Sequence, residues 1–564
     1  MEYITDLKEE ARITRQLQMK RSARLVSHIT TPIFYPNARP HLGHLYSSLL
    51  CDVQHRWKLL KGVDSLLTTG TDEHGLKIQL ASEKNHYKNP REFVDKLYPE
   101  FIGLDKFYNV KFTKFIRTTD PSHIENVLKL WELCNKNGYI YKGEHHGWYS
   151  ISDETFYPES KVIVDPKDPT RHINTESFNE VIYQSETNYY FKLSAFQDKI
   201  LKYIETEHPE FVYPPSKRDQ LLKDLRVNPL QDLSISRPAT RLQWGITVPN
   251  DPEQKIYVWF DALCNYVSAV GGIDTTIQPA TIPSPHWTQT THLIGKDITK
   301  FHCLYWPSFL MASNLPLPKR VVIHNHWISN GMKMSKSLGN VVDPITVGKK
   351  YGPDIVRWYL LENSKIDTDG DFIEDNVTGL RQLFVSKWGN LINRCCGQKF
   401  NIARAVNTFS MDPYASISSL WKDNDEVTTH IDNIFEQLNK LPEKMDDKIE
   451  KFDHSNLLRE IWNLINDANS LIQVSKPWEN PQLQQDSIIF LCIETARILS
   501  ILTQPIIPTI SNNFLDRIDV KPESRTLDYV IIGADNSYAD NANSSKRNVP
   551  LEYAPSGTEF THDM

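Results

Sequence analysis

The spacing of apolar residues predicts a strand, a helix and a second strand at the start of the chain. Residues 25–33 are rich in β-branched side chains and favour a strand. After a loop with two prolines, apolar residues recur every three or four positions, as in a helix with one buried face: Leu42, Leu45, Leu49, Val53, Trp57 and Leu60. Gly62 follows this helix, and residues 64–69 form the next apolar run. This order predicts the opening of a parallel nucleotide-binding sheet.

The pattern then changes twice along the chain. Residues 111–227 contain short alternating runs with many aromatic and polar side chains, which indicates an insertion. The strand and helix pattern resumes near Ile256, with strands predicted at 291–294 and 320–326 around a helix at 298–313. From residue 376 to about 514 the apolar spacing is helical, which predicts a separate helical domain.

We therefore predict an α/β fold in which a parallel-sheet domain carries an insertion and precedes a helical bundle. The predicted segments are a leader at 1–26, two halves of the sheet domain at 27–110 and 228–326, the insertion at 111–227, a loop region at 327–375, the bundle at 376–520 and a mostly mobile tail at 521–564. The tail is rich in Asn, Ser, Asp and Pro, and only residues 529–532 are apolar enough to pack.

Composition narrows the class of protein. With 564 residues, 40% of them hydrophobic, the chain is long enough for several folded domains. The net charge of −7 excludes a uniformly basic surface, so any contact with nucleic acid must use a local patch. The 7 cysteines form no C-x-x-C pair, which argues against a disulfide framework and a thiolate zinc site. The apolar stretch 487–510 contains Glu494, Arg497 and two prolines, so we interpret it as a buried helix and not a membrane span.

The first residues have a composition typical of targeting segments. Residues 11–27 contain five basic side chains and no acid, as in organellar transit peptides. Four acidic residues among the first ten weaken that interpretation, although Met19 opens a shorter acid-free start. The alternative is a solvated basic arm.

The first chemical motif is His41-Leu42-Gly43-His44, at the predicted start of a helix directly after the first strand. Unpaired backbone N–H groups and positive potential favour phosphate there, and the two imidazoles can donate hydrogen bonds to phosphate oxygens. Gly43 lets a flat base approach the backbone. Two ordinary surface histidines are the alternative interpretation of this motif alone.

The second motif is a loop with two lysines around a small hydroxyl residue, Lys333-Met334-Ser335-Lys336-Ser337, bounded by Gly331 and Gly339. Such a loop can close over a triphosphate and stabilise the charge that develops as pyrophosphate leaves. A solvated loop is the alternative, but the position after a predicted strand and downstream of the first motif favours phosphate chemistry.

With both motifs, the chain resembles the class I aminoacyl-tRNA synthetases, and among them the methionyl-tRNA synthetases. The resemblance spans residues 28–478 and, apart from the lysine loop, is strongest at 32–37, 70–75, 257–262 and 294–297. It implies a Rossmann-like catalytic domain with an inserted connective domain, a signature-loop and stem-contact region, and an α-helical anticodon-binding bundle. It also implies that methionine is activated with ATP to methionyl-adenylate and transferred to the 3′ end of tRNA(Met).

The resemblance implies a role for each matching residue. Asp72 would hold the ammonium group of methionine, and seven positions would enclose its side chain: Ile33, Tyr35, Trp259, Leu263, Tyr266, Ile298 and His302. The residues that would bind ATP are His41, Gly43, His44, Gly295, Asp297, Lys333, Ser335 and Lys336. Those that would be catalytic are His41, His44, Lys333, Lys336 and Arg237. Those that would read the anticodon are Asn390, Arg394 and Trp478.

Several of these positions also have purely structural interpretations. Trp259 and Tyr266 could be ordinary core aromatics, and Asp72 or Asp297 could cap a helix or turn. At the anticodon positions the alternative is a routine helix surface with a buried tryptophan. Leu263 differs from the proline that bacterial relatives often have, and residues 238–241 after Arg237 depart from the usual family pattern.

The resemblance also sets expectations for metals, partners and location. Mg²⁺ is expected with ATP, and no structural zinc is expected because residues 147–157 of the insertion contain no cysteine. His145, His146, His324 and His326 are metal-like but have no further ligands nearby in the sequence. The expected partners are tRNA(Met), L-methionine and ATP, with no membrane, and the chain is expected to be a monomer. The zinc-free insertion and short C-terminus most resemble fungal mitochondrial members, so we expect the mitochondrial matrix, with the cytoplasm as the alternative.

Three other functions stay open at this point. A class I synthetase for leucine, isoleucine or valine would need a larger editing insertion, and one for cysteine would need a zinc-thiolate site. A small-molecule nucleotidyltransferase shares the first motif but would lack the helical RNA-reading domain. A synthetase without activity, acting only as an RNA-binding or scaffolding protein, is disfavoured by the intact lysine loop and Asp72.

Overall fold

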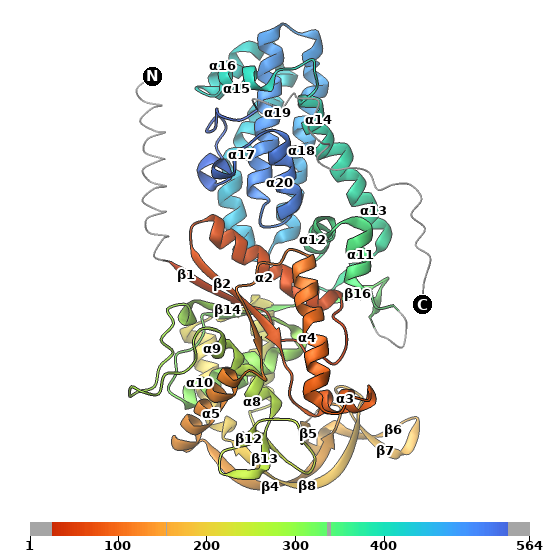
Figure 1. Ribbon diagram of the computed structural model, residues 1–564, viewed down its shortest axis with the longest axis vertical. Coiled ribbons are helices and arrows are strands. Elements are labelled where there is room, and N and C mark those ends of the chain that lie inside the picture. The colour runs from red at the N-terminus through yellow and green to blue at the C-terminus, as the bar shows by residue number, and fades with distance from the viewer. Residues whose placement is uncertain (1–24, 154, 335–339, 540–564) are drawn as a thin grey trace.

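A computed structural model describes residues 25–153, 155–334 and 340–539 of the chain. Figure 1 shows two stacked parts, an α/β half below and a helical half above, with helix α2 (Leu42–Leu60) between them. No helix among the described residues is long and apolar enough to cross a membrane.

The α/β half is built on one parallel sheet with strand order β3-β2-β1-β14-β15-β9. Its strands are β1 (Val26–Thr30), β2 (Asp64–Thr71), β3 (Lys114–Arg117), β9 (Val212–Tyr213), β14 (Thr290–Gly295) and β15 (Arg320–His324). On one side the chain runs outward from β1 through β2 to β3, and on the other it runs outward from β14 to β15, beside which the earlier strand β9 forms the edge. The strand order therefore reverses between β1 and β14, which is where such sheets bind ligands.

Two local predictions for this half differ from the structure. β3 and β9 lie inside the range predicted as an insertion, but both pair in the main sheet. They are short edge strands, so their apolar pattern gave little signal. The helix predicted at 298–313 is three consecutive pieces: the 3₁₀ turn η5 (Lys296–Ile298), the π-helical turn η6 (Phe301–Tyr305) and α10 (Trp306–Ala312).

The remaining insertion is an antiparallel sheet ordered β5-β4-β8-β7-β6, with β10 paired to β8. Its strands are β4 (Ile140–Ser150), β5 (Thr155–Tyr157), β6 (Val162–Asp165), β7 (Asp168–Asn174), β8 (Glu180–Phe191) and β10 (Leu233–Ser234). The carboxylate of Asp153 joins the turns of this sheet by accepting hydrogen bonds from Tyr157 (3.1 Å), Asn174 (3.1 Å), Ser177 (2.5 Å) and Asn179 (2.7 Å). Within the described ranges, no group of three or more His, Cys, Asp or Glu side chains could hold a metal ion.

The helical half surrounds one fully buried helix, α19 (Gln482–Leu502). All its residues from Asp486 onward are buried, as expected for a helix that is apolar on every side. The others are α11 (Pro344–Tyr351), α12 (Pro353–Glu362), α13 (Glu374–Leu383), α14 (Asn390–Cys395), α15 (Ile402–Phe409), α16 (Pro413–Trp421), α17 (Asp425–Glu450), α18 (His454–Ser475) and α20 (Pro508–Arg517).

Helix α2 ties the two halves together. Arg357 of α12 is fully buried and donates hydrogen bonds to Asp52 of α2 at 2.7 Å and to backbone oxygens of Pro505 and Ile506 in the bundle. Near the other end of α2, Trp57 donates to Asp446 of α17 at 2.8 Å. The buried side chains of α2 belong to one hydrophobic core that runs from the parallel sheet into the helical bundle.

The segment after residue 521 differs from the mobile tail that we predicted, as far as Ala539. Arg497 of α19 donates to the backbone oxygens of Tyr529 and Ile531, while its partner Glu494 accepts from the hydroxyl of the fully buried Tyr538 at 2.7 Å. The polar composition of this segment gave no sign of packing, because the segment is held by hydrogen bonds to the buried Glu494–Arg497 ion pair and not by an apolar pattern. Residues 540–564 of the predicted tail, and residues 1–24 of the predicted leader, lie outside the described residues.

Candidate active site

A cleft of about 1650 Å³ opens at the carboxyl ends of β1, β14 and β15, beside the start of α2. Nine of the residues predicted for the site line it: Ile33, Tyr35, His41, Gly43, His44, Trp259, Gly295, Asp297 and Ile298. Segments far apart in the sequence therefore meet where the strand order reverses, as the parallel sheet requires.

The backbone at the start of α2 fixes the orientation of both motif histidines. His41 is the N-cap residue, and its Nδ1 accepts from the Gly43 N–H at 3.1 Å. The Nδ1 of His44 accepts from the His41 N–H at 3.0 Å. An imidazole that accepts at Nδ1 carries its hydrogen at Nε2, so Nε2 is the donor of each ring. Burial, with a contribution from His41, holds the pKa of His44 well below its usual range, so that ring is neutral.

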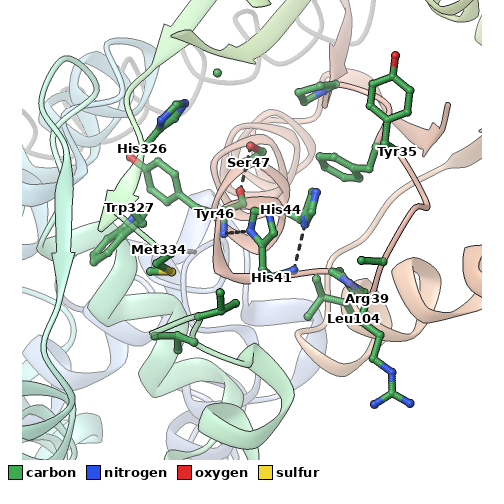
Figure 2. Close-up of a pocket in the computed structure, with 18 of the residues that line it drawn as sticks. Tyr35, Arg39, His41, His44, Tyr46, Ser47, Leu104, His326, Trp327 and Met334 are labelled. Carbon is green, nitrogen blue, oxygen red and sulfur yellow. Dashed lines mark hydrogen bonds between the residues drawn. The ribbon is translucent and has the colours of Figure 1, made fainter. Parts of the chain in front are cut away.

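Figure 2 shows how the cleft is arranged around these rings. Tyr35 and Arg39 lie on one side of the start of α2, while His326, Trp327 and Met334 lie on the other. His44 also packs edge-on against Phe34, with ring centroids 4.7 Å apart. The two imidazoles thus lie between aromatic side chains such as Phe34 on one side and, on the other, the end of β15 and the start of β16 (Trp327–Ser329).

Two further histidines, at the end of β15, belong to the site although the sequence offered them only as weak metal candidates. His324 donates from Nδ1 to the Asn325 carbonyl at 2.7 Å, and its Nε2 lies 2.8 Å from the hydroxyl of Ser47 on α2. Burial lowers the pKa of His324 to about 4. His326 lies 3.2 Å from the Asp297 carboxylate. Their position after a parallel strand was the signal that could have identified them.

The residues predicted to enclose methionine form two layers. Ile33, Tyr35, Trp259 and Ile298 line the cleft, whereas the other three are almost fully buried behind it: Leu263, Tyr266 and His302. The ring of Trp259 stacks on Phe301 with centroids 3.8 Å apart, a neighbour that the sequence analysis did not include.

The inner layer carries a directed hydrogen-bond chain. His302 Nδ1 lies 3.0 Å from the Ile298 carbonyl, to which it must donate. Burial lowers the pKa of His302 to about 4, so the ring is neutral and its Nε2 accepts from the Tyr266 hydroxyl at 2.6 Å. The Tyr266 oxygen is therefore oriented by the protein before any substrate is bound.

Asp72 is buried just after β2, behind the same wall. Its backbone N–H donates to the Phe34 carbonyl at 2.9 Å, which fixes the turn between the two segments. The pKa of Tyr266 is raised, first by burial and then by nearby negative groups that include Asp72. Asp72 and the inner layer thus share one environment, although Asp72 is not among the residues that line the open cleft.

Arg237 lies apart from this arrangement. It belongs to β11 (Ser236–Pro238), where it donates to the Ser234 hydroxyl at 2.9 Å and to the Ser236 carbonyl at 2.7 Å. Its guanidinium sits near the rings of Tyr149 and Tyr257, at 5.4 and 4.8 Å. It is not among the described residues that line the cleft, so its catalytic role stays a prediction.

The lysine loop is described only at its beginning. β17 (Met332–Lys333) pairs with β16, and Met334 lines the cleft. Ser335 and Lys336 lie outside the described residues, as does the Lys333 side chain. Lys296 and Lys349, which the sequence analysis missed, also line the cleft, and Lys296 pairs with Asp369 at 2.9 Å.

The predicted RNA-reading residues lie on the helical half. Asn390 is exposed and Arg394 half-buried on α14. Trp478 lies in the 3₁₀ turn η9 (Pro477–Glu479) and is 44% exposed, which excludes the interpretation that it is a buried core residue.

Comparison with known proteins supports a single family. A family model described as "tRNA synthetases class I (M)" matches residues 27–396. The mitochondrial methionine–tRNA ligase of Saccharomyces cerevisiae is 60% identical over 94% of this chain and 96% of its own length. That of Candida albicans is 42% identical over 95% of this chain and 97% of its own. The solved structure of Mycobacterium tuberculosis methionyl-tRNA synthetase bound by methionyl-adenylate has a TM-score of 0.79 at 30% identity, covering 93% of this chain and 98% of that one.

Proposed function

The chain belongs to the methionyl-tRNA synthetases of class I, and from this premise we propose how its own residues carry out the reaction. It is a mitochondrial methionine–tRNA ligase, which activates L-methionine with ATP and transfers it to tRNA. The finer assignments below concern the substrate contacts, the metal, the tRNA and the oligomeric state.

We propose that the methionine side chain enters between Tyr35 and Trp259 and reaches the inner layer at Tyr266. A soft, polarizable thioether fits against aromatic faces such as those of Tyr35, Trp259 and Tyr266. Asp72 would hold the substrate ammonium group through a charge-assisted bond, which is strong where water is excluded.

The phosphates of ATP would lie at the start of α2. His41 and His44 line the cleft there, their Nε2–H groups would donate to phosphate oxygens, and the helix N-terminus adds positive potential. Gly43 leaves room for the base, with Gly295 and Asp297 at the ribose. Lys333, Ser335 and Lys336 would close over the polyphosphate from the loop that begins at Met334.

The chemistry in this arrangement is in-line transfer without a protein nucleophile. The methionine carboxylate attacks the α-phosphorus, an oxygen–phosphorus bond forms, and the bond to pyrophosphate breaks. Donors at the start of α2 and in the lysine loop stabilise the charge on the departing pyrophosphate. The terminal ribose hydroxyl of tRNA then attacks the carbonyl carbon of the adenylate, and AMP leaves.

The remaining assignments concern partners. We infer that Mg²⁺ enters with ATP and neutralises the polyphosphate; the described residues offer it no ligand cluster, and no step above depends on it. The tRNA would be tRNA(Met), with Asn390, Arg394 and Trp478 at the anticodon. We expect a monomer, and we place it in the matrix of the mitochondrion, the organelle for which the relatives are named.

The observation that carries the proposal is the meeting of two phosphate-directed imidazoles with an aromatic, sulfur-compatible pocket in one cleft. Pyrophosphate exchange measured with a panel of amino acids tests it. We expect exchange with methionine, and at least about 100-fold less with leucine, isoleucine or valine, which lack the thioether. Equal exchange with a branched-chain amino acid would contradict the proposal.

A further inference from the structure

A buried network of two histidines and one aspartate lies directly behind the methionine pocket. Asp261 of α8 (Val258–Leu263) accepts from His74 Nδ1 on one carboxylate oxygen and from His123 Nε2 on the other, both at 2.7 Å. All three side chains are buried. His74 follows β2, whereas His123 comes from α5 (Pro121–Lys136), inside the range that the sequence assigned to the insertion.

The network holds the two short helices that carry much of the pocket wall. Asp261 lies two positions after Trp259, which is about 200° around a helix, so the carboxylate anchors the face opposite the cleft. The other nitrogen of His123, Nδ1, lies 3.0 Å from the hydroxyl of Ser268 on α9 (Asn265–Ala269), two positions after Tyr266. His123 is thus fixed to both helices at once.

The same network reaches the proposed ammonium site from the other end. His74 is two residues beyond Asp72, and the intervening Glu73 is held by Arg117 at 2.7 Å. The indole N–H of Trp244 donates to the Glu73 carbonyl, and the backbone carbonyl of Trp244 accepts from the Gly75 N–H. These hydrogen bonds hold the loop that carries Asp72. The hydrogen bond from His74 to Asp261 connects this loop to the helices of the pocket.

Burying an ionised carboxylate costs more free energy than burying an apolar side chain of similar size. Ionising it is opposed by burial, yet His74 and His123 beside it keep the pKa of Asp261 below its usual range. Apolar side chains of similar size would pack as well without that penalty. A directed network of this kind defines geometry instead, because each bond fixes both a distance and an angle.

We propose that His123 and Asp261 are positioning residues for methionine, which set the spacing between the carboxylate of Asp72 and the wall formed by Trp259 and Tyr266. This inference rests on the methionine-binding roles proposed above. The network touches neither the start of α2 nor the lysine loop's first residues, so it governs methionine and not ATP.

The test is steady-state pyrophosphate exchange of the full-length enzyme, with separate KM values for methionine and ATP. We expect His123→Leu, which keeps volume but removes the donor, to raise the KM for methionine about 10- to 100-fold. The KM for ATP should stay within about twofold. His123→Gln places an amide N–H near the position of Nε2 and should recover most of the affinity. His454→Leu removes an equally buried histidine from the bundle and should change neither KM.

The outcomes separate positioning from mere packing. A lower melting temperature for His123→Leu with an unchanged methionine KM would show that the network only stabilises the fold. Equal increases in both KM values, or no recovery with glutamine, would also overturn the proposal. If His123→Leu does not fold, Asp261→Asn keeps the shape and tests the same spacing. Asp72→Asn serves as the separate check on the proposed function: an unchanged methionine KM there would refute the ammonium site irrespective of His123.

Discussion

The imidazoles of His41 and His44 each present one N–H to the cleft, because both Nδ1 atoms are occupied by backbone hydrogens of the helix start. Because these hydrogen bonds fix both rings, the two side chains do not have to change rotamer when ATP binds. The donors are in place before charge develops, which is the condition under which they stabilise a transition state most.

At this scale we predict that His44→Ala lowers the rate of methionine-dependent pyrophosphate exchange about 10²- to 10³-fold, the usual loss for one preorganised donor. The KM for methionine should change little, because the ring faces the phosphates. His44→Gln, whose amide can donate from a similar position, should lose less. A large rise in the KM for methionine with an unchanged maximal rate would contradict the role.

We also predict that Asp72→Asn raises the KM for methionine about 10- to 100-fold, since a neutral amide cannot pair with the ammonium group. Asp297→Asn is the matched control, because the ribose contact that we propose for Asp297 would make this variant alter the KM for ATP instead. Unchanged kinetics for Asp72→Asn would reduce this residue to a turn-stabilising side chain.

At the scale of elements, the carboxylate of Asp153 joins separate parts of the insertion. Asp153 accepts hydrogen bonds from Tyr157 of β5, from Asn174 at the end of β7, and from Ser177 and Asn179 after it. Burial raises the pKa of its carboxyl, but the hydrogen bonds of Ser177, Asn179 and Tyr157, with that of Ser150, keep it below the usual range. We predict that Asp153→Ala lowers the free energy of unfolding by about 1–3 kcal/mol, measured by denaturant titration. Glu159→Ala, an exposed acid nearby, should have almost no effect. Metal analysis should find no stoichiometric zinc, and one tightly bound zinc per chain would refute this account of the insertion.

The exposed turn η9 permits a second test at this scale. If Trp478 stacks on an anticodon base, Trp478→Ala should weaken tRNA binding by about 1–3 kcal/mol. Aminoacylation would fall while pyrophosphate exchange stays near that of the wild type, because the cleft is in the other half. A parallel loss of both activities together with the melting temperature would show a structural role, and no change in either would refute the anticodon assignment.

At the scale of the whole molecule, buried neutral histidines predict an acid limit on stability. Burial lowers the pKa of His28 to about 3, and of His302 and His454 to about 4. The unfolded chain takes up these protons near pH 6.5, whereas the folded protein does not until near pH 4. Each group therefore removes about 1.4 kcal/mol of stability per pH unit as the pH falls from about 6.5 toward 4. The melting temperature should drop steeply over that range, and His454→Leu should reduce the slope by about one proton.

The sequence predicted those features that have a strong local pattern. The apolar period of α2, the β-branched runs of β1 and β2 and the helical bundle all stand in the structure, as does the meeting of His41, Trp259 and Asp297 in one cleft. The sequence did not predict features that depend on contacts between separate parts of the chain. The edge strands β3 and β9, and the packing of residues 522–539, depend on partners outside the local pattern: Lys114 pairs with Thr68, Val212 with Val321, and Tyr538 with Glu494. His324 was underrated for the same reason, because its partner Ser47 is 277 residues distant.

The sharing of α2 between both halves limits how the chain can be shortened. A chain cut after residue 396, where the class I family model ends, would keep Arg357 but lose Pro505 and Ile506, its backbone partners. It would also lose α17, which packs against α2, and α18, which packs against α12. The result would be an exposed apolar surface and a buried guanidinium with too few acceptors. During synthesis of the chain, the face of α2 that packs on the bundle would likewise stay exposed until α17 has been made.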